Sequence, residues 1–428
     1  MISIVMLFFS VLFLLFLPFG TLITSGLGIV FNRKYAKLYL FFFVLVISLP
    51  ILRYSPAYGD DSSWHYFAAS EFSKFGSFRD LMEWLYDGHS YVGRYNYKEI
   101  PIFTYIMYFF SDTFTYSLIS FVVCIITYYC YTVTIVDLYQ ENHILKRYLL
   151  VGLIAIILAN NYRYTTSGMR YCLSMSLMMM VLYFDAKIEK GKIGSIFFSI
   201  FYLIPFLVHP AVIYFICIRF AYPFINKIKW YSILLLLLAF PVLAYLVPYL
   251  ANLLGHEMLL MYASKIEAYL SNDAYAELFV FTIMVRMYIG TLVIFLYLFL
   301  FLFLKKNIEN ENMLFRLFMV LTFYFSIFSL GTVFARNIYD RNLFIVYPMI
   351  VLSTTILIMR INSFVDNLNN RNFLYFTCGC IYFLCVFIGF FYNKNFPLGY
   401  IDYSVSDIFT KNIFEYFSNL PRFYLNTN

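Results

Sequence analysis

Six arginines stand at or just inside one end of the long apolar segments of this chain. They are Arg53, Arg163, Arg170, Arg286, Arg336 and Arg341. A guanidinium group presents a planar fork of donors that fits phosphate oxygens, and it keeps its charge when water is removed. Charged side chains at such depth in a membrane are costly and usually functional. Together these arginines predict a phosphate or diphosphate site; the plainer alternative for each is a contact with lipid phosphates or a pair with a carboxylate.

Arg286 is the most deeply placed of the six. It lies about seven residues inside the apolar segment 279–304, which corresponds to about 10 Å of helix, and that segment holds no acidic residue. Arg163 and Arg170 are seven residues apart and would share a face of one continuous helix. Arg336 and Arg341 flank Asn-Ile-Tyr-Asp, a sequence that indicates a turn. The carboxylates that could pair with these arginines are Asp60, Asp61, Glu257 and Asp340.

His209 alone among the five histidines lies in an apolar stretch, Phe-Leu-Val-His-Pro-Ala-Val, where Pro210 interrupts a helix. A neutral imidazole there could act as a general base toward a sugar hydroxyl or donate to a phosphate. The plainer alternative is a packed histidine that bonds to the carbonyl freed by the proline.

Asp60 and Asp61 provide the acidic candidates for base catalysis, in the string Gly-Asp-Asp-Ser-Ser-Trp-His-Tyr. Carboxylates beside aromatic rings suit carbohydrate, because sugar faces stack on rings while acids accept hydroxyl hydrogen bonds. Trp64 and Tyr66 are the candidate glycan contacts, and the aromatic belt of a membrane interface is the other explanation for such residues. The seven cysteines lie in apolar segments without zinc spacing, so no metal is expected.

The amino-acid composition indicates the class of protein in which these residues lie. Of 428 residues, 63% are hydrophobic and only 12% are charged, which predicts an all-α, polytopic integral membrane protein. The expected spans number about twelve, within a range of ten to thirteen, and form one membrane domain over residues 1–428. They are 2–31, 36–53, 102–139, 147–161, 169–185, 193–208, 210–225, 230–250, 279–304, 313–333, 342–359 and 372–392.

Two of these segments have unusual lengths. The stretch 102–139 is too long for one crossing, which predicts an interfacial piece to Phe110, an interruption at Ser111-Asp112-Thr113 and then the crossing itself. The two halves of 193–225 are short, which predicts a broken or re-entrant helix pair.

The basic residues indicate the orientation. Short alternate loops hold ten of the lysines and four arginines, and are assigned to the cytoplasm by the positive-inside rule. The opposite side holds five lysines and nine arginines, together with nearly all the irregular chain. That irregular chain comprises a large extracytoplasmic loop near 54–101, a second loop at 251–278 and a tail at 393–428.

The order of several short motifs resembles the integral-membrane polysaccharide polymerases of the Wzy and EpsG type. The motifs are Leu-Arg-Tyr at 52–54 followed by Gly-Asp-Asp and Tyr66, Ser-Gly-Met-Arg at 167–170, His209-Pro210, and Asp-Arg-Asn at 340–342 before Tyr347-Pro348. The aspartate is doubled here, and Ser-Pro-Ala at 55–57 replaces the glycine and threonine usual in the family. Whether Asp60 or Asp61 matches the family therefore stays open.

The resemblance implies a glycosyltransferase of O-antigen, capsule or lipopolysaccharide synthesis, located in the bacterial inner membrane as a multi-pass protein with its active site facing the periplasm. Its substrates are oligosaccharide repeat units linked to undecaprenyl diphosphate, within membrane lipid, with a flippase and a chain-length regulator as partner proteins. It uses no cofactor, no nucleotide sugar and no nucleic acid. The arginines would stabilise the leaving diphosphate, and His209, Asp60 or Asp61 would be the base.

Two other functions fit part of the same pattern. A flippase for the lipid-linked repeat also has about twelve spans and a basic interior, but it predicts a pseudo-repeat between the halves, which this chain lacks. An O-antigen ligase shares the donor chemistry and differs only in its acceptor.

Overall fold

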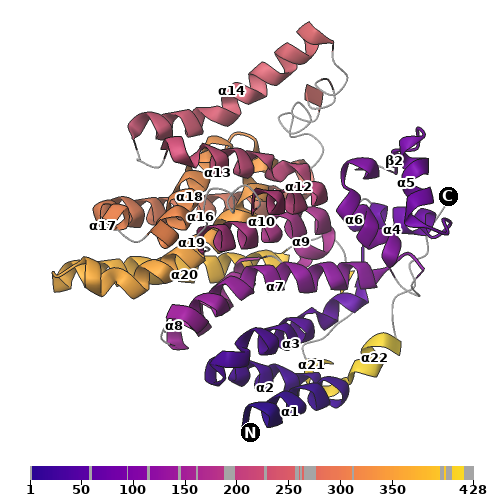
Figure 1. Ribbon diagram of the computed structural model, residues 1–428, viewed down its shortest axis with the longest axis horizontal. Helices are drawn as coiled ribbons and strands as arrows, with labels where there is room; N and C mark the ends of the chain where they lie inside the picture. Colours follow the sequence, from indigo (N-terminus) through magenta and orange to yellow (C-terminus); the bar gives the residue numbers. More distant parts are fainter. Residues whose placement is uncertain are drawn as a thin grey trace.

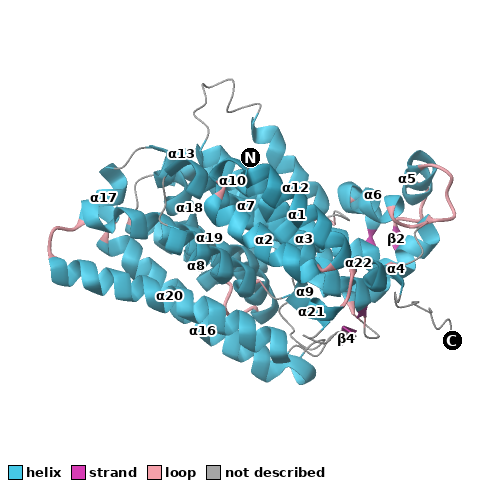
Figure 2. Ribbon diagram, turned by 90° about the horizontal axis from the view of Figure 1, so that it is seen from below, coloured by secondary structure: helices cyan, strands magenta, loops and turns pink. Residues whose placement is uncertain are grey.

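The structure is a computed structural model, and almost all of its described residues are helical. It describes residues 2–56, 60–93, 95–112, 116–142, 146–160, 162–187, 198–225, 229–255, 260, 263–264, 276–310, 313–395, 400–401 and 407–418. Long helices run side by side, and shorter helices gather at one end of the bundle (Figure 1). The view turned by 90° shows the same separation, with α4, α5 and α6 at the end opposite to α17 (Figure 2).

The N-terminal part contains α1 to α3 and the segment that follows them. Its elements are α1 (Ile2–Phe16), α2 (Pro18–Phe31), η1 (Arg33–Tyr35), α3 (Ala36–Ser48), η2 (Leu49–Arg53) and β1 (Tyr54–Ser55). The stretch that follows is a folded cap: α4 (Asp61–Phe72), α5 (Phe78–Tyr86), β2 (Tyr91–Val92), β3 (Tyr95–Asn96), η3 (Tyr97–Glu99) and α6 (Pro101–Phe109).

The rest of the bundle begins with α7 (Ser117–Asn142), α8 (Lys146–Ala159), α9 (Tyr162–Ser167) and α10 (Met169–Lys187). The broken region holds η4 (Ile200–Tyr202), α12 (Leu203–Val208), η5 (Pro210–Val212) and α13 (Ile213–Ile225). Then follow α14 (Trp230–Leu254), α16 (Ala276–Phe303), α17 (Lys305–Asn310), α18 (Met313–Gly331), α19 (Arg336–Phe364) and α20 (Leu368–Asn395). The described part of the chain ends with β4 (Tyr400–Ile401), α21 (Asp407–Thr410) and α22 (Ile413–Ser418).

Five helices in the described part of the chain are long and apolar enough to cross a membrane, or six if one bent pair counts as a span. They cover Arg33–Arg53, Ser117–Gln140, Met284–Phe303, Ile338–Phe364 and Leu368–Phe391, and the pair Tyr231–Ala239 and Pro241–Leu254 is bent by 50°. Other apolar helices, among them α1, α2 and the stretch Tyr148–Ala159, have only 10 to 17 residues. The predicted all-α class with membrane-crossing helices is confirmed, but the count of about twelve spans is not.

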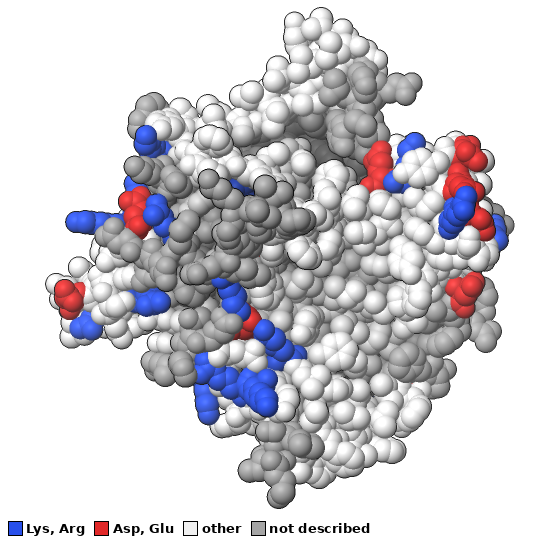
Figure 3. Space-filling model, in the orientation of Figure 1, with Lys and Arg blue, Asp and Glu red and all other residues white. Residues whose placement is uncertain are grey.

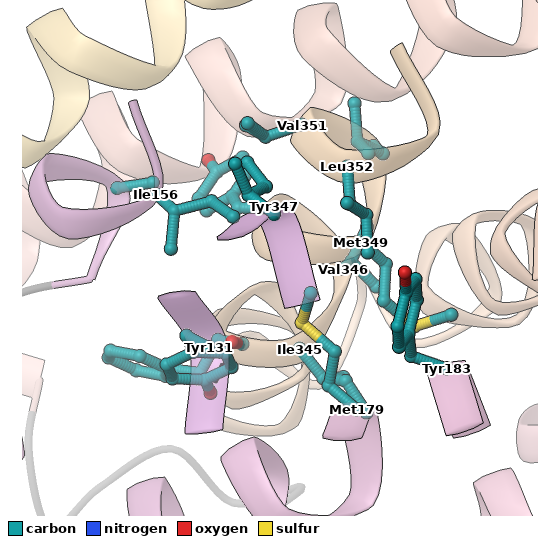
Figure 4. Close-up of a cluster of buried hydrophobic side chains, with 14 of the residues drawn as sticks. Tyr131, Ile156, Met179, Tyr183, Ile345, Val346, Tyr347, Met349, Val351 and Leu352 are labelled. Atoms are coloured by element: carbon teal, nitrogen blue, oxygen red, sulfur yellow. Dashed lines mark hydrogen bonds between the residues drawn. The ribbon is translucent and has the colours of Figure 1, made fainter. Parts of the chain in front are cut away.

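Helix α19 forms the centre of the bundle, since 94% of its apolar window is buried. Its neighbours pack apolar side chains against it, including Tyr131 of α7, Ile156 of α8 and Met179 of α10 (Figure 4). Between helices surrounded by lipid, hydroxyl hydrogen bonds supply part of the attraction that water supplies in soluble proteins. Tyr131 donates to the carbonyl oxygen of Phe344 at 2.8 Å, and Thr322 bonds Ser353 at 2.9 Å.

The cap over residues 60–109 is the main departure from the irregular chain expected there. It has its own apolar core, in which Tyr66, Phe72 and Tyr97 are fully buried and pack with Met169 and Leu173 of α10. The β2–β3 hairpin closes over this core with Gly93 at φ +63°, where an added Cβ would collide with the Trp64 ring. The expectation of irregular chain was wrong because a polar loop with apolar residues at helical spacing can bury its own core.

The predicted breaks within two helical regions are present. α6 ends at Phe109 and α7 starts at Ser117, so the long stretch 102–139 is divided close to Ser111. His209 has extended backbone angles, φ −157° and ψ 120°, between α12 and η5. Residues 188–197 lie outside the described part, as does most of the predicted loop 251–278.

Candidate functional site

The two ends of the bundle carry different basic residues. Helix α10 has Arg170 in its first turn and Lys187 at its last residue. At the lysine end, Asp137 of α7 accepts hydrogen bonds from Lys37 and Lys187, and Asp185 pairs with Arg219 at 2.5 Å. We call the opposite end, which holds Arg170 and the cap, the arginine end.

Arg170 contacts the cap through Tyr95. Its guanidinium carbon lies 3.9 Å from the centre of the Tyr95 ring, a cation–π contact. The same ring stacks on His65, with centroids 4.8 Å apart, and its hydroxyl donates to Oδ1 of Asp61. One side chain of the hairpin therefore joins an arginine of the bundle to a carboxylate of the cap.

His65 is buried within this contact. Its Nδ1 lies 2.8 Å from the Tyr97 hydroxyl. Burial holds the pKa of His65 well below its usual range, and the positive charge of Arg170 acts in the same direction. The ring is therefore neutral at pH 7, and Arg170 lies close enough to act on it.

The Tyr171 ring lies close to the other basic residues of the arginine end. Its ring lies 5.3 Å from the His209 ring, and the Arg341 guanidinium lies 5.8 Å from its centre. Phe344 is the next ring, 6.5 Å from Tyr171, and the guanidinium of Arg286 lies 4.0 Å from its centre. Arg170, His209, Arg286 and Arg341, which we call the basic cluster, therefore surround the start of α10 and α19.

Arg286 forms a buried ion pair within the basic cluster. It is 1% exposed, and its Nη1 donates to Oδ1 of Asp340 at 3.0 Å. Asp340 belongs to α19, whereas the apolar segment that contains Arg286 holds no acid. The pair therefore joins two segments that are far apart in the sequence. Arg170, His209 and Arg341 are only half-buried, and a ligand would reach them before Arg286.

His209 has a defined local hydrogen bond. Its Nδ1 accepts from the backbone N–H of Ala211 at 3.1 Å, while α10 contributes Ser174 Oγ, which donates to the His209 carbonyl oxygen at 3.3 Å. A backbone N–H can only donate, so the neutral ring carries its proton on Nε2. His209 is therefore a donor toward a ligand in its neutral form, which fits contact with a phosphate better than the role of base.

Asp60 is a buried anchor. It is 1% exposed, its side chain caps α4 by accepting from the N–H of Ser62 at 3.3 Å, and it accepts from the hydroxyls of Tyr54 and Ser167. It thus joins three elements, namely β1, the start of α4 in the cap and the end of α9. Burial raises the pKa of the Asp60 carboxyl above its usual range, although the bonds from Ser167 and Tyr54 oppose this.

Replacement of Asp60 by Asn should change how stability depends on pH. The pKa of Asp60 is higher in the native state than in the unfolded state, where it is about 3.9. The contribution of Asp60 to the free energy of unfolding is therefore fully present below about pH 3.9, and it is lost as the pH rises through the native pKa. Asp60→Asn has no such ionisation and keeps an equally good N-cap. Thermal unfolding from about pH 4 to 8 should show the midpoint of the wild type falling relative to the variant. Parallel pH curves would contradict the assignment.

Asp61 is more accessible than its neighbour. It is half-buried at the first turn of α4 and accepts from Tyr95. Trp64 is half-buried beneath the hairpin, whereas Tyr66 is 1% exposed and lies 2.6 Å from Ser120 Oγ. Tyr66 therefore packs the cap onto α7, and Trp64 and Tyr95 are the aromatic residues nearer to Asp61.

The structure does not place the other three predicted arginines in the basic cluster. Arg53 is 7% exposed, and its Nη2 donates to the carbonyl oxygen of Glu415 at 3.3 Å. Arg336 is exposed at the first residue of α19. The side chain of Arg163 lies outside the described part; its helix, α9, ends at Ser167, so α9 and α10 do not form the continuous helix that would place Arg163 and Arg170 on one face.

The predicted turn between Arg336 and Arg341 is wrong. Both residues belong to α19, where five positions correspond to about 140° around the axis. Arg341 therefore faces Tyr171 while Arg336 is exposed. The polar sequence between them resembles a turn, but Asp340 is buried against Arg286, and that pair stabilises the helix start.

Sequence reasoning gave no role to Tyr171 or His65. Tyr171 follows Arg170 directly, and that position next to a predicted site residue is the signal that marks it. No protein-family model, curated protein sequence or solved structure matches the chain.

Proposed function

We propose that the protein polymerises oligosaccharide repeat units carried on undecaprenyl diphosphate, and that the reaction takes place at the arginine end. A hydroxyl of the acceptor repeat attacks the anomeric carbon of the donor glycan. The bond from that carbon to the diphosphate oxygen breaks, the diphosphate leaves with the electron pair, and a base takes the hydroxyl proton. Two groups are needed, namely cations for the leaving diphosphate and a carboxylate for the proton.

One observation carries this proposal: a half-buried arginine, Arg170, and a half-buried carboxylate, Asp61, contact the same side chain, Tyr95, where the cap meets the bundle. Arg170 touches Tyr95, and Tyr95 donates to Asp61. Preorganised cations in a partly dry site stabilise charge that develops in the transition state, because they need no reorganisation when it forms. A lipid-linked substrate would place its diphosphate at this level, since the cluster lies at the ends of membrane-crossing helices.

The residues divide between these tasks according to their exposure. We assign Arg170 and Arg341 to the diphosphate, with His209 donating from Nε2, and Asp61 to the acceptor proton. Arg286 supports the site electrostatically from its ion pair with Asp340. Trp64, which is half-buried, provides a ring on which a sugar face can stack.

Deletion of the gene, with and without a plasmid copy, tests the proposal by gel analysis of the surface glycan. A polymerase deletion leaves a single repeat capping the acceptor, because flipping and ligation still work. Complete loss of surface glycan with repeats retained inside would indicate a flippase. Long polymer accumulating on undecaprenyl diphosphate would indicate a ligase.

The same deletion strain tests the arginines when the plasmid carries variants. Arg341→Lys keeps the charge but loses the fork, and removal of one preorganised donor typically lowers the rate about 100-fold. Arg336→Lys is the matched control, because it lies on the same helix and is exposed. We expect little polymer with the first variant and normal polymer with the second, at equal amounts of inserted protein. Equal polymer from both would remove Arg341 from the site.

A further inference from the structure

A groove between α3 and α7 opens on the outside of the bundle, away from the proposed reaction site. It has a volume of about 540 Å³ and is lined by Lys37, Leu38, Phe41, Ile125, Ile126 and Tyr129. Five of these six side chains are apolar or aromatic, and Leu38 and Phe41 are each 41% exposed. A surface of this kind, between two helices of a membrane bundle, is accessible to lipid chains.

The groove lies within one leaflet. Its lining runs from Lys37 to Phe41 on α3 and from Tyr129 to Ile125 on α7, and the rings of Phe41 and Tyr129 lie 6.4 Å apart. Four helical positions correspond to about 6 Å, so the lining extends over about 12 Å. The hydrocarbon core is about 30 Å thick, so one leaflet is about 15 Å. The groove therefore runs from the level of Lys37 toward the middle of the membrane.

The mouth of the groove carries an accessible basic side chain. Lys37 and Lys187 both donate to the carboxylate of Asp137, and the side chain of Lys37 remains 39% exposed. Lys34, in the turn before α3, is exposed. Figure 3 shows basic side chains gathered where the ends of α3 and α8 lie, whereas much of the described surface toward the cap is uncharged. An anionic group is the complementary ligand at this position.

We propose that this groove binds a phospholipid with an anionic headgroup in the lysine-end leaflet. The headgroup phosphate contacts Lys37 outside its bond to Asp137, and one acyl chain lies along Leu38, Phe41 and the α7 side chains. A lysine ammonium retains donors after one bond to a carboxylate, since it has three. The site is independent of the proposed polymerase reaction, which lies at the opposite end of α10.

Native mass spectrometry of the full chain released from nanodiscs tests the site. The discs contain equal amounts of phosphatidylglycerol and phosphatidylcholine. The wild type should retain phosphatidylglycerol in preference to phosphatidylcholine, and Lys37→Gln should retain about fivefold less, the factor that one lysine contributes at an anionic lipid surface. Asp137 keeps Lys187 and Tyr183 as partners in this variant, so the fold is maintained.

A second variant blocks the part of the groove that would hold the acyl chain and leaves the charge of the protein unchanged. Leu38→Trp fills the groove from its exposed edge and should also lower retention, whereas Phe376→Trp, at a 69% exposed position of α20, should not. Unchanged retention in both Lys37→Gln and Leu38→Trp would overturn the proposal. Equal retention of the two phospholipids by the wild type would overturn the choice of an anionic headgroup. A polyprenyl phosphate retained in place of phospholipid, from protein purified out of cell membranes, would overturn the assigned occupant.

Discussion

Asp61→Asn is expected to abolish polymer formation while leaving the protein folded in the membrane. Asn cannot accept a proton, and loss of a positioned general base lowers rates by about 100- to 10,000-fold. The Tyr95 hydroxyl can still donate to the side-chain oxygen, so the contact between hairpin and α4 is kept. The measurement is incorporation of repeat units by purified protein in liposomes that contain the lipid-linked repeat, with binding of that repeat measured separately. Binding should remain.

Two other aspartates of the cap, Asp60 and Asp87, provide controls. Asp87→Asn changes an exposed carboxylate after α5 and should leave the rate unchanged. Asp60→Asn changes the buried anchor, keeps its cap, and should lower the rate much less than Asp61→Asn. If Asp60→Asn stopped the reaction and Asp61→Asn did not, the base would be Asp60, reached by rearrangement of its hydrogen bonds to Tyr54 and Ser167.

Arg286→Met should destabilise the protein by about 3 to 5 kcal/mol, the typical cost of leaving one member of a buried ion pair uncompensated. Asp340 is 5% exposed and would lose its partner in the interior of the bundle. The double variant Arg286→Met with Asp340→Leu should recover most of that stability, because the two apolar side chains leave no buried charge. Unfolding of the detergent-solubilised protein by increasing denaturing detergent provides the comparison.

Arg336→Met is the matched control for stability, since it removes an exposed arginine from the same helix and should change little. The double variant also separates stability from function. It should fold and yet make less polymer, because it lacks the positive charge next to Phe344. A stable Arg286→Met single variant would show that Asp340 does not depend on this pair.

The helical membrane class was predictable because so apolar a chain must satisfy its backbone within helices in a bilayer. The breaks near Ser111 and at His209 were predictable too, from segment length and from Pro210. The number of spans was not, because apolarity does not fix helix length. Segments such as Pro18–Phe31 and Tyr148–Ala159 have the composition of a span in helices of fewer than 18 residues.

Individual site residues were partly predictable from residue type. Arg341 and His209 do gather around one ring, that of Tyr171, and Arg170 precedes this residue in the chain. The contact of Arg170 with Tyr95 was not predictable, because it depends on tertiary packing between segments far apart in the sequence. Asp340 was among the carboxylates expected to pair with the arginines, but its pairing with Arg286 in particular also depends on such packing. The different burial of Asp60 and Asp61 also depends on such packing, since adjacent residues at a helix start face different surroundings.

The pairing of β1 with β4 has a consequence for biosynthesis. Tyr54 lies opposite Ile401, 347 positions later in the chain, and the ribosome adds about 5 to 20 residues per second. Roughly 20 to 70 s therefore pass between the translation of β1, which leads to Asp60, and the translation of its partner β4. During that interval a nascent chain can insert its helices while the segment before the cap has no strand beside it. A translation product that stops before residue 400 would keep the membrane bundle but never receive this last strand.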